Sequence, residues 1–178
     1  MTERRRKSRE RSVTEDRGAK MGKKNGMAEC GRHEIFTLTV PARRDAFEQL
    51  RASLSTAAAH LRIPERETDH LLIAADEVFS NIAAYAYPDG GGTVEIRMTA
   101  NADCTELSLA FSDRGIPFDP LAVRPPDTSA PLADRKIGGL GIHVVRRLMD
   151  QVVYRRAEDG RNILTLTKHL PSVGEARP

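Results

Sequence analysis

The sequence predicts a two-layer α+β sandwich, in which a mixed or antiparallel sheet carries three helices on one face. Three segments have apolar residues at the three- and four-residue spacing of a helix face: residues 47–61, 65–85 and 140–149. Five shorter segments have apolar runs or the alternation of strands: residues 35–40, 94–98, 107–111, 152–154 and 163–166. Helices and strands do not alternate regularly along this order, which argues against a doubly wound parallel fold.

Proline and glycine mark the boundaries between these segments. The first strand ends at Pro41, which cannot donate a hydrogen bond to a sheet. Pro64 suits the first turn of the second helix, because its missing N–H costs nothing there, and Glu65 and Glu67 favour the positive end of the helix dipole. The run Pro-Asp-Gly-Gly-Gly at residues 88–92 is a turn, and the two strands after it are expected to form a hairpin.

A long polar stretch separates this hairpin from the last helix. Residues 113–136 are rich in proline and show little apolar periodicity. Loops of this length inside compact domains are usually functional or mobile. We therefore expect a lid over a binding site.

The charge of the chain is unevenly distributed. Residues 1–31 contain 10 Lys and Arg against 5 Asp and Glu, whereas residues 32–178 contain 18 against 20. We predict a disordered basic segment at residues 1–31, one domain at residues 32–170 and a tail at residues 171–178, because the first segment has too few apolar side chains to fold. The mildly acidic body argues against direct binding of nucleic acid.

Membrane and disulfide chemistry are not expected. The sequence contains no apolar run near the roughly 20 residues that a membrane-spanning helix needs. The two cysteines, Cys30 and Cys104, have neither the spacing of metal ligands nor that of a disulfide framework. We expect a cytoplasmic protein.

The second predicted helix carries a candidate catalytic pair, Glu77 and Asn81. The two residues are four apart and therefore share one helix face. They lie beside a stripe that we expect to face the core, formed by Leu72, Ala75, Phe79, Ile82, Ala83 and Ala86. Asn81 offers an amide oxygen to a hard cation such as Mg²⁺, and Glu77 can act as a base. Taken alone, such a pair is more often a surface hydrogen-bonded pair.

Two further motifs can bind parts of a nucleotide. Asp113 ends a strand and can accept a hydrogen bond from the amine of a base, while Gly115 would let the backbone approach the ring. Gly138, Gly139 and Gly141 precede or begin the last helix, where N–H groups can bind phosphates. Each motif alone is weak evidence, since Asp-x-Gly is commonly a turn. The glycines match neither the P-loop nor the dinucleotide-binding pattern.

The order of these motifs carries a family resemblance. Residues 76–81 with 85–88, residues 113–120 and residues 137–142 resemble the ATP-binding motifs shared by gyrase, the heat-shock chaperone ATPase, sensor histidine kinases and mismatch-repair ATPases. The motifs resemble those of bacterial anti-sigma-factor serine kinases more closely than the wider group, and this resemblance covers about residues 33–170. It implies a Bergerat-type fold with a mobile ATP lid. The sequence departs from the family at Tyr85, where histidine is common.

The resemblance implies a role for each motif residue. Glu77 would be the general base, and Asn81 the Mg²⁺ ligand of an ATP site. Asp113 would bind the adenine amine, with Gly115 beside the ring. The remaining residues would contact the phosphates: Arg135, Lys136, Gly138, Gly139 and Gly141.

The resemblance also implies partners. The protein would be an ATP-dependent serine kinase that phosphorylates an anti-sigma-factor antagonist, sequesters a sigma factor and forms a homodimer through its first strand and sheet edge. The alternative is a regulatory switch that binds ATP and a partner without significant phosphate transfer. Neither function involves a membrane or direct contact with nucleic acid.

Overall fold

The computed structural model describes residues 32–122 and 140–171 of the chain. Within these ranges, five strands form one antiparallel sheet in the order β1-β2-β3-β5-β4. The strands are β1 (Arg32–Pro41), β2 (Thr93–Asn101), β3 (Glu106–Asp113), β4 (Gln151–Arg156) and β5 (Asn162–His169).

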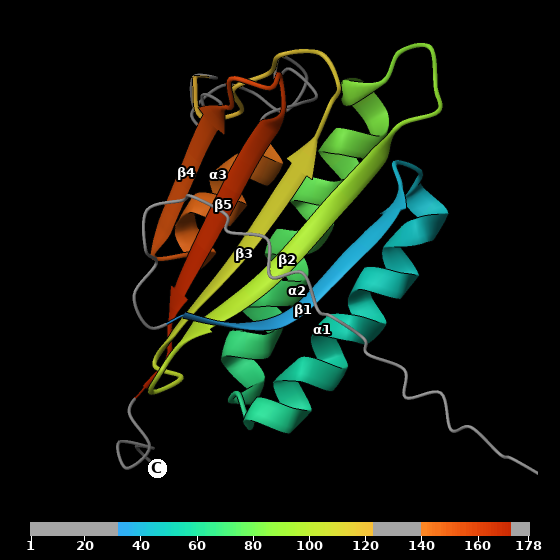
Figure 1. Ribbon diagram of the computed structural model, residues 1–178. Coiled ribbons are helices and arrows are strands. Elements are labelled where there is room, and N and C mark those ends of the chain that lie inside the picture. The colour runs from blue at the N-terminus through green and yellow to red at the C-terminus, as the bar shows by residue number, and fades with distance from the viewer. Residues whose placement is uncertain (1–31, 123–139, 172–178) are drawn as a thin grey trace, which may run out of the picture.

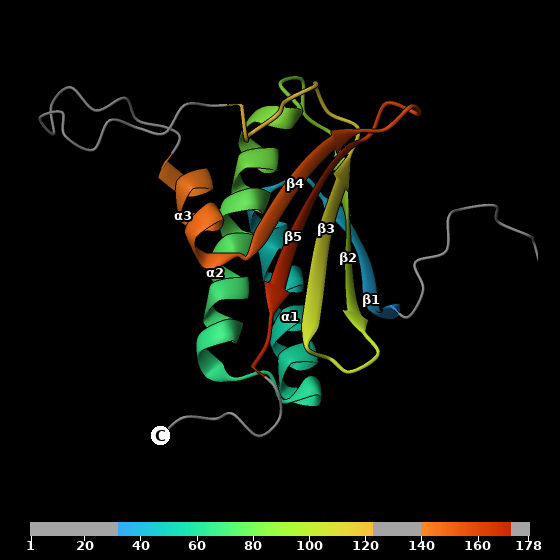
Figure 2. The same ribbon diagram turned by 90° about the vertical axis from the view of Figure 1, so that its left-hand side faces the viewer.

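Three helices cover one face of this sheet (Figures 1 and 2). They are α1 (Phe47–Leu61), preceded by the short 3₁₀ turn η1 (Arg44–Ala46), then α2 (Glu65–Asn81) and α3 (Leu140–Leu148). The predicted α+β sandwich is thereby confirmed, and its sheet is antiparallel throughout the described strands.

The core lies between the sheet and the helices. Alternate residues of the central strands face the helices, and the register places Ile96 beside Phe111, which in turn lies beside Leu164. Phe79 of α2 is fully buried over this layer, and its ring lies 5.9 Å from that of Phe47 in α1. Burial of such aromatic side chains contributes strongly to folding. The packed core thereby positions α2 over the strands.

The buried face of α2 differs in part from the predicted stripe. Ala75, Phe79 and Ala86 are buried as expected, whereas Leu72, Ile82 and Ala83 are only half-buried. The other buried positions are Leu71, Ala74 and Val78. The buried face of α2 is therefore rotated slightly from the one that the spacing suggested.

The second predicted helix, residues 65–85, also ends differently. The α-helix stops at Asn81 and continues as one π-helical turn, η2 (Ile82–Ala86). A π turn shifts hydrogen bonding from the fourth to the fifth residue along the chain, which apolar periodicity does not report. Such turns are frequent at functional sites.

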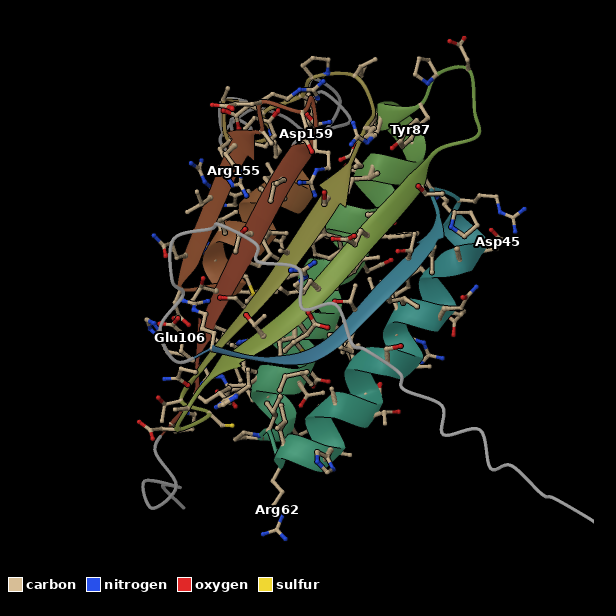
Figure 3. All side chains as sticks on the ribbon, in the orientation of Figure 1. Asp45, Arg62, Tyr87, Glu106, Arg155 and Asp159 are labelled. Atoms are coloured by element: carbon tan, nitrogen blue, oxygen red, sulfur yellow. The ribbon has the colours of Figure 1, made fainter. Side chains whose placement is uncertain are left out.

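Hydrogen bonds join the end of η2 to the end of β3. The Ile116 N–H donates to the Ala86 carbonyl at 2.9 Å. The Tyr87 hydroxyl donates to the Thr93 carbonyl at 3.0 Å and accepts from the Arg114 N–H at 2.9 Å. Burial raises the pKa of Tyr87 and the Asp113 carboxylate adds to this, against the lowering effect of the Arg114 N–H, so the hydroxyl remains a donor. Figure 3 shows Tyr87 at the end of the molecule opposite Arg62.

Arg62 ends α1 in a left-handed conformation, with φ of 54° and ψ of 41°. L-residues adopt this region at a cost of roughly 1–2 kcal/mol that glycine avoids, although glycine also gains freedom in the unfolded chain. We expect Arg62→Gly to raise the free energy of unfolding by about 0.5–1 kcal/mol, measured by thermal or urea denaturation. Arg51→Gly, within the same helix, is the control and should lower it by about 1 kcal/mol. A loss of stability in Arg62→Gly would contradict the expectation.

Asp150 connects the end of α3 to β5. Its Oδ2 accepts the His169 backbone N–H at 2.7 Å and lies 3.4 Å from the Lys168 ammonium, which also donates to the Leu148 carbonyl at 2.9 Å. Burial raises the pKa of Asp150, but the His169 N–H and Lys168 outweigh it and hold the pKa below its ordinary value.

The lowered pKa of Asp150 predicts a pH dependence of stability. The folded chain favours the carboxylate, so this contribution is complete above the unfolded pKa of about 4 and disappears as pH falls through the lower folded pKa. We expect Asp150→Asn to lower the melting temperature at pH 7 and to have little effect near pH 2. Melting curves across this range check the sign, and an equal loss at both pH values would contradict it.

Some predicted features lie outside the described residues. These are the basic segment at residues 1–31, residues 123–136 of the expected lid, and the tail beyond residue 171. In residues 32–122 and 140–171, no helix is both long and apolar enough to cross a membrane.

Candidate functional site

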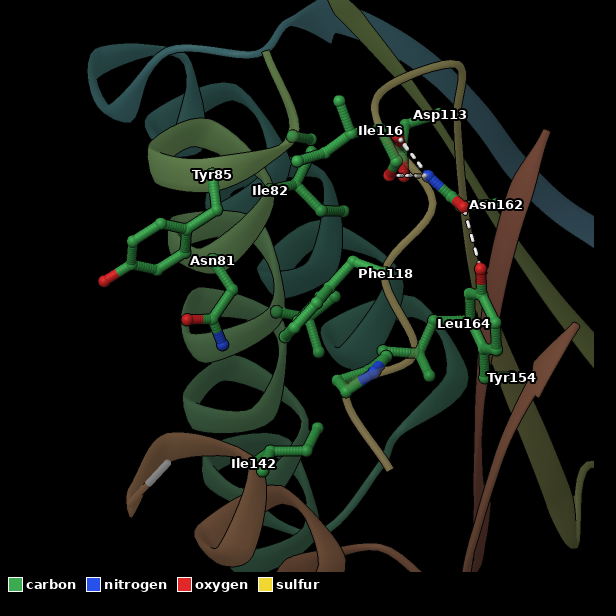
Figure 4. A pocket seen from close by; sticks show the side chains of 13 residues that line it. Asn81, Ile82, Tyr85, Asp113, Ile116, Phe118, Ile142, Tyr154, Asn162 and Leu164 are labelled. Atoms are coloured by element: carbon green, nitrogen blue, oxygen red, sulfur yellow. Dashed lines mark hydrogen bonds between the residues drawn. The ribbon is translucent and has the colours of Figure 1, made fainter. Parts of the chain in front are cut away.

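A pocket opens where α2, η2, the end of β3, α3 and β5 meet (Figure 4). Its lining is largely apolar, with polar groups supplied by Asn81, Asp113 and Asn162. Figure 4 shows Phe118 projecting between Asn81 and Leu164. An apolar cavity with a few convergent polar groups is typical of sites for small molecules and cofactors.

Asp113 lines the pocket and is only 6% exposed. Its Oδ1 accepts the Gly115 N–H at 2.8 Å and the Asn162 amide at 3.0 Å. Among the described residues, no donor contacts Oδ2. One oxygen therefore anchors the carboxylate to Gly115 and Asn162.

Asn162 is a site residue that the sequence analysis missed. It pairs with Asp113 across the β3–β5 ladder, and its side chain is buried. Its Oδ1 accepts hydrogen bonds from the Tyr154 hydroxyl at 2.8 Å and from Arg156 at 2.6 Å. These bonds orient the amide so that its NH₂ group points toward Asp113 (Figure 4). The antiparallel register was the only signal that could have identified it.

Gly115 is packed against the polypeptide backbone. A Cβ atom built at this position would lie 2.6 Å from the Ala86 Cβ and would overlap the Ala86 carbonyl oxygen. Residue 115 must therefore be small, because the last residue of η2 lies directly against it. Gly115 was predicted to lie beside a ligand ring, and the contact with Ala86 is a different reason for glycine.

Glu77 and Asn81 lie one turn apart near the end of α2, and both are half-buried. Asn81 lines the pocket, whereas Glu77 lies against Gly141 at the start of α3. The structure thus brings together three predicted site residues from two helices. The neighbouring carboxylate, Asp76, is exposed and accepts from the Ser80 hydroxyl at 3.4 Å.

The other predicted phosphate contacts lie outside the described residues: Arg135, Lys136, Gly138 and Gly139. Within the described ranges, no group of three His, Cys, Asp or Glu side chains is placed to hold a metal. A Mg²⁺ ion that keeps waters and is shared with phosphates needs only one or two protein ligands. The Asn81 amide in the pocket wall fits that requirement.

The fold and the pocket define a class of ATP-binding α+β domain. Residues 40–168 match the family described as "Histidine kinase-like ATPase domain". The chain belongs to this family, which implies that it binds ATP.

Several curated relatives are protein kinases. The chain is 33% identical over 141 residues to "Serine-protein kinase RsbW" of Halalkalibacterium halodurans, with 77% of this chain and 84% of the relative covered. It is 35% identical over 99 residues to "Serine/threonine-protein kinase BtrW" of Bordetella bronchiseptica, covering 56% and 68%. The chain therefore belongs to the RsbW-like group of serine kinases.

A solved structure supports the fold. The RsbU and RsbW domains of a Mycobacterium tuberculosis protein match with a TM-score of 0.53 and 17% identity, covering 77% of this chain and 34% of that one. At this identity, the match concerns the fold alone.

Proposed function

We propose that this protein is an ATP-dependent protein-serine kinase that phosphorylates an anti-sigma-factor antagonist. The observation that carries the proposal is the position of Glu77, a half-buried carboxylate between α2 and α3, one turn from Asn81 in the pocket wall. A carboxylate next to a nucleotide pocket provides the base that a protein kinase needs and that simple nucleotide binding does not. The kinase names of the relatives support the same assignment.

Each residue of the proposed site would have a separate role in the reaction. The Oδ2 atom of Asp113 would accept a hydrogen bond from the adenine amine, and the Asn81 amide oxygen would ligate Mg²⁺. The bound ion supplies neutralisation of the phosphate charge. Glu77 would accept the proton of the serine hydroxyl. At the same time the serine oxygen would form a bond to the γ-phosphorus, and the bond between the γ-phosphorus and the oxygen of the β-phosphate would break. Gly141 and the predicted phosphate contacts before it would hold the phosphates.

The proposed biological setting is a partner-switching module in the cytoplasm. In it, the kinase sequesters a sigma factor until the unphosphorylated antagonist displaces that partner. A homodimer through the β1 edge belongs to the same proposal. The relatives' family supports this setting.

The decisive experiment combines ATP binding with phosphate transfer. The full chain is titrated with ATP and Mg²⁺ and then incubated with labelled ATP and candidate antagonists, each matched by a variant with alanine at the acceptor serine. We expect phosphoserine on one antagonist and none on its alanine variant. We also expect Asn81→Ala to lose the Mg²⁺-dependent part of its ATP affinity. ATP binding without phosphoserine on any candidate would overturn the kinase proposal in favour of a regulatory switch.

A further inference from the structure

The Glu77 carboxylate lies directly against the α-carbon of Gly141. A Cβ atom built on Gly141 would overlap Glu77 Oε2 and would lie 2.8 Å from its Cδ, closer than real Cβ atoms approach their neighbours. Glu77 belongs to the C-terminal half of α2, and Gly141 is the second residue of α3. The position of this carboxylate between the helices therefore depends on the missing side chain of Gly141.

The backbone of Gly141 does not itself require glycine. Its φ lies outside the left-handed region, in contrast to Gly90, Gly91 and Gly160, whose φ angles are 78°, 82° and 81°. Glycine is also a poor helix former, so a helical glycine needs another reason. The space beside Glu77 provides that reason.

We propose that Gly141 is a positioning residue for Glu77, in addition to any contact of its N–H with phosphate. The inference rests on the proposed function, because phosphate transfer gives the position of this carboxylate its importance. A Cβ atom at residue 141 would meet the flexible end of a glutamate side chain. The carboxylate would therefore swing away, while the helices and the backbone N–H of residue 141 stay in place.

The first test measures stability and needs no activity. Gly141→Ala is made in three backgrounds: the natural sequence, Glu77→Ala and Asp76→Ala. In Glu77→Ala the new methyl group meets no carboxylate, so better helix propensity should raise the melting temperature by about 2 °C. In the natural sequence and in Asp76→Ala, the methyl group meets the Glu77 carboxylate. The melting temperature should therefore rise by about 2 °C less than in Glu77→Ala. Equal changes in all three backgrounds would overturn the proposed contact.

The second test measures transfer to the antagonist and ATP affinity. Gly141→Ala should lower the transfer rate at saturating ATP at least about 10-fold while the Kd for ATP stays within about twofold, because the backbone N–H is retained. Glu77 Cγ is 3.6 Å from the built Cβ, an ordinary contact. In Glu77→Asp this position holds the carboxyl carbon, and rotation about the Cβ–Cγ bond can turn its oxygens away from residue 141. Adding Gly141→Ala to that variant should therefore change transfer less than twofold.

The outcomes separate this inference from the proposed function. A large loss of ATP affinity in every Gly141→Ala variant would overturn the inference, because the room beside Gly141 would then be needed by the phosphates of ATP and not by Glu77. An equal loss of transfer in the Glu77 and Glu77→Asp backgrounds would also overturn it. If the natural sequence transfers no phosphate at all, the proposed function fails, and the catalytic part of the inference fails with it. The melting temperatures would still decide whether Gly141 seats the carboxylate.

Discussion

Glu77→Gln is expected to lower the rate of phosphate transfer by a factor of about 10²–10⁴, the usual contribution of a general base. Glutamine has nearly the same shape as glutamate and keeps the contact with Gly141, but its amide cannot accept the proton of the serine hydroxyl. The affinity for ATP should stay within a few-fold, because Glu77 lies beside the nucleotide pocket and does not line it. Single-turnover transfer and equilibrium ATP binding measure the two quantities separately.

Asp76→Asn is the matched control for this prediction. Asp76 is the adjacent carboxylate of α2, is exposed and contacts Ser80. Its removal changes the local charge by the same amount and should leave transfer within about threefold. Equal losses in both variants would assign the effect to charge near the phosphates and contradict a base at Glu77.

Asp113→Asn is expected to weaken ATP binding by about 30- to 1,000-fold. The Oδ1 atom already accepts from the Gly115 and Asn162 N–H groups, so an asparagine must keep its oxygen there. The asparagine NH₂ group would then face the adenine amine. Both groups are donors, so the hydrogen bond that the Asp113 carboxylate would accept is lost. Loss of a hydrogen bond to a charged group costs about 1.5–3 kcal/mol, and the unpaired donor adds to this.

Nucleotide selectivity provides a sharper measurement than affinity alone. Inosine triphosphate carries a carbonyl oxygen where ATP carries the amine, and this oxygen can accept from the asparagine NH₂ group. Asp113→Asn should therefore lower the ratio of ATP affinity to inosine triphosphate affinity. Asp119→Asn is the control, because Asp119 also accepts an N–H two residues ahead, at 2.8 Å, but is exposed outside the pocket. An unchanged ratio in Asp113→Asn would contradict adenine recognition by this carboxylate.

The fold could be predicted because its elements have clear local patterns. The apolar spacing of residues 47–61 and the turn at residues 88–92 correspond to α1 and to the connection before β2. The end of α2 could not be predicted in the same way. The π turn at Ile82–Ala86 widens the hydrogen bonding without interrupting the apolar pattern, so one continuous helix was expected.

The candidate site was predictable where chemistry and spacing coincide in sequence. Asn81 and Asp113 were identified by residue type, and both line the pocket. Asn162 was not, because its role arises from its position opposite Asp113 in a sheet register that spans 49 residues of sequence. The contact of Gly141 with Glu77 was hidden for a similar reason, since a glycine-rich helix start was interpreted only as a phosphate site.

The hydrogen bond between Ile116 and Ala86, together with the bonds of Tyr87, ties the segment after β3 to the segment after α2. Asp113 and Asn81 both line the pocket and belong to elements that these hydrogen bonds join. Under the proposed function, the distance between the residue that binds the base and the residue near the phosphates would therefore be set by the fold. Analogues with a longer or shorter connection between base and phosphates would then satisfy one contact only, and the proposed site would select its ligand by length as well as by chemical group.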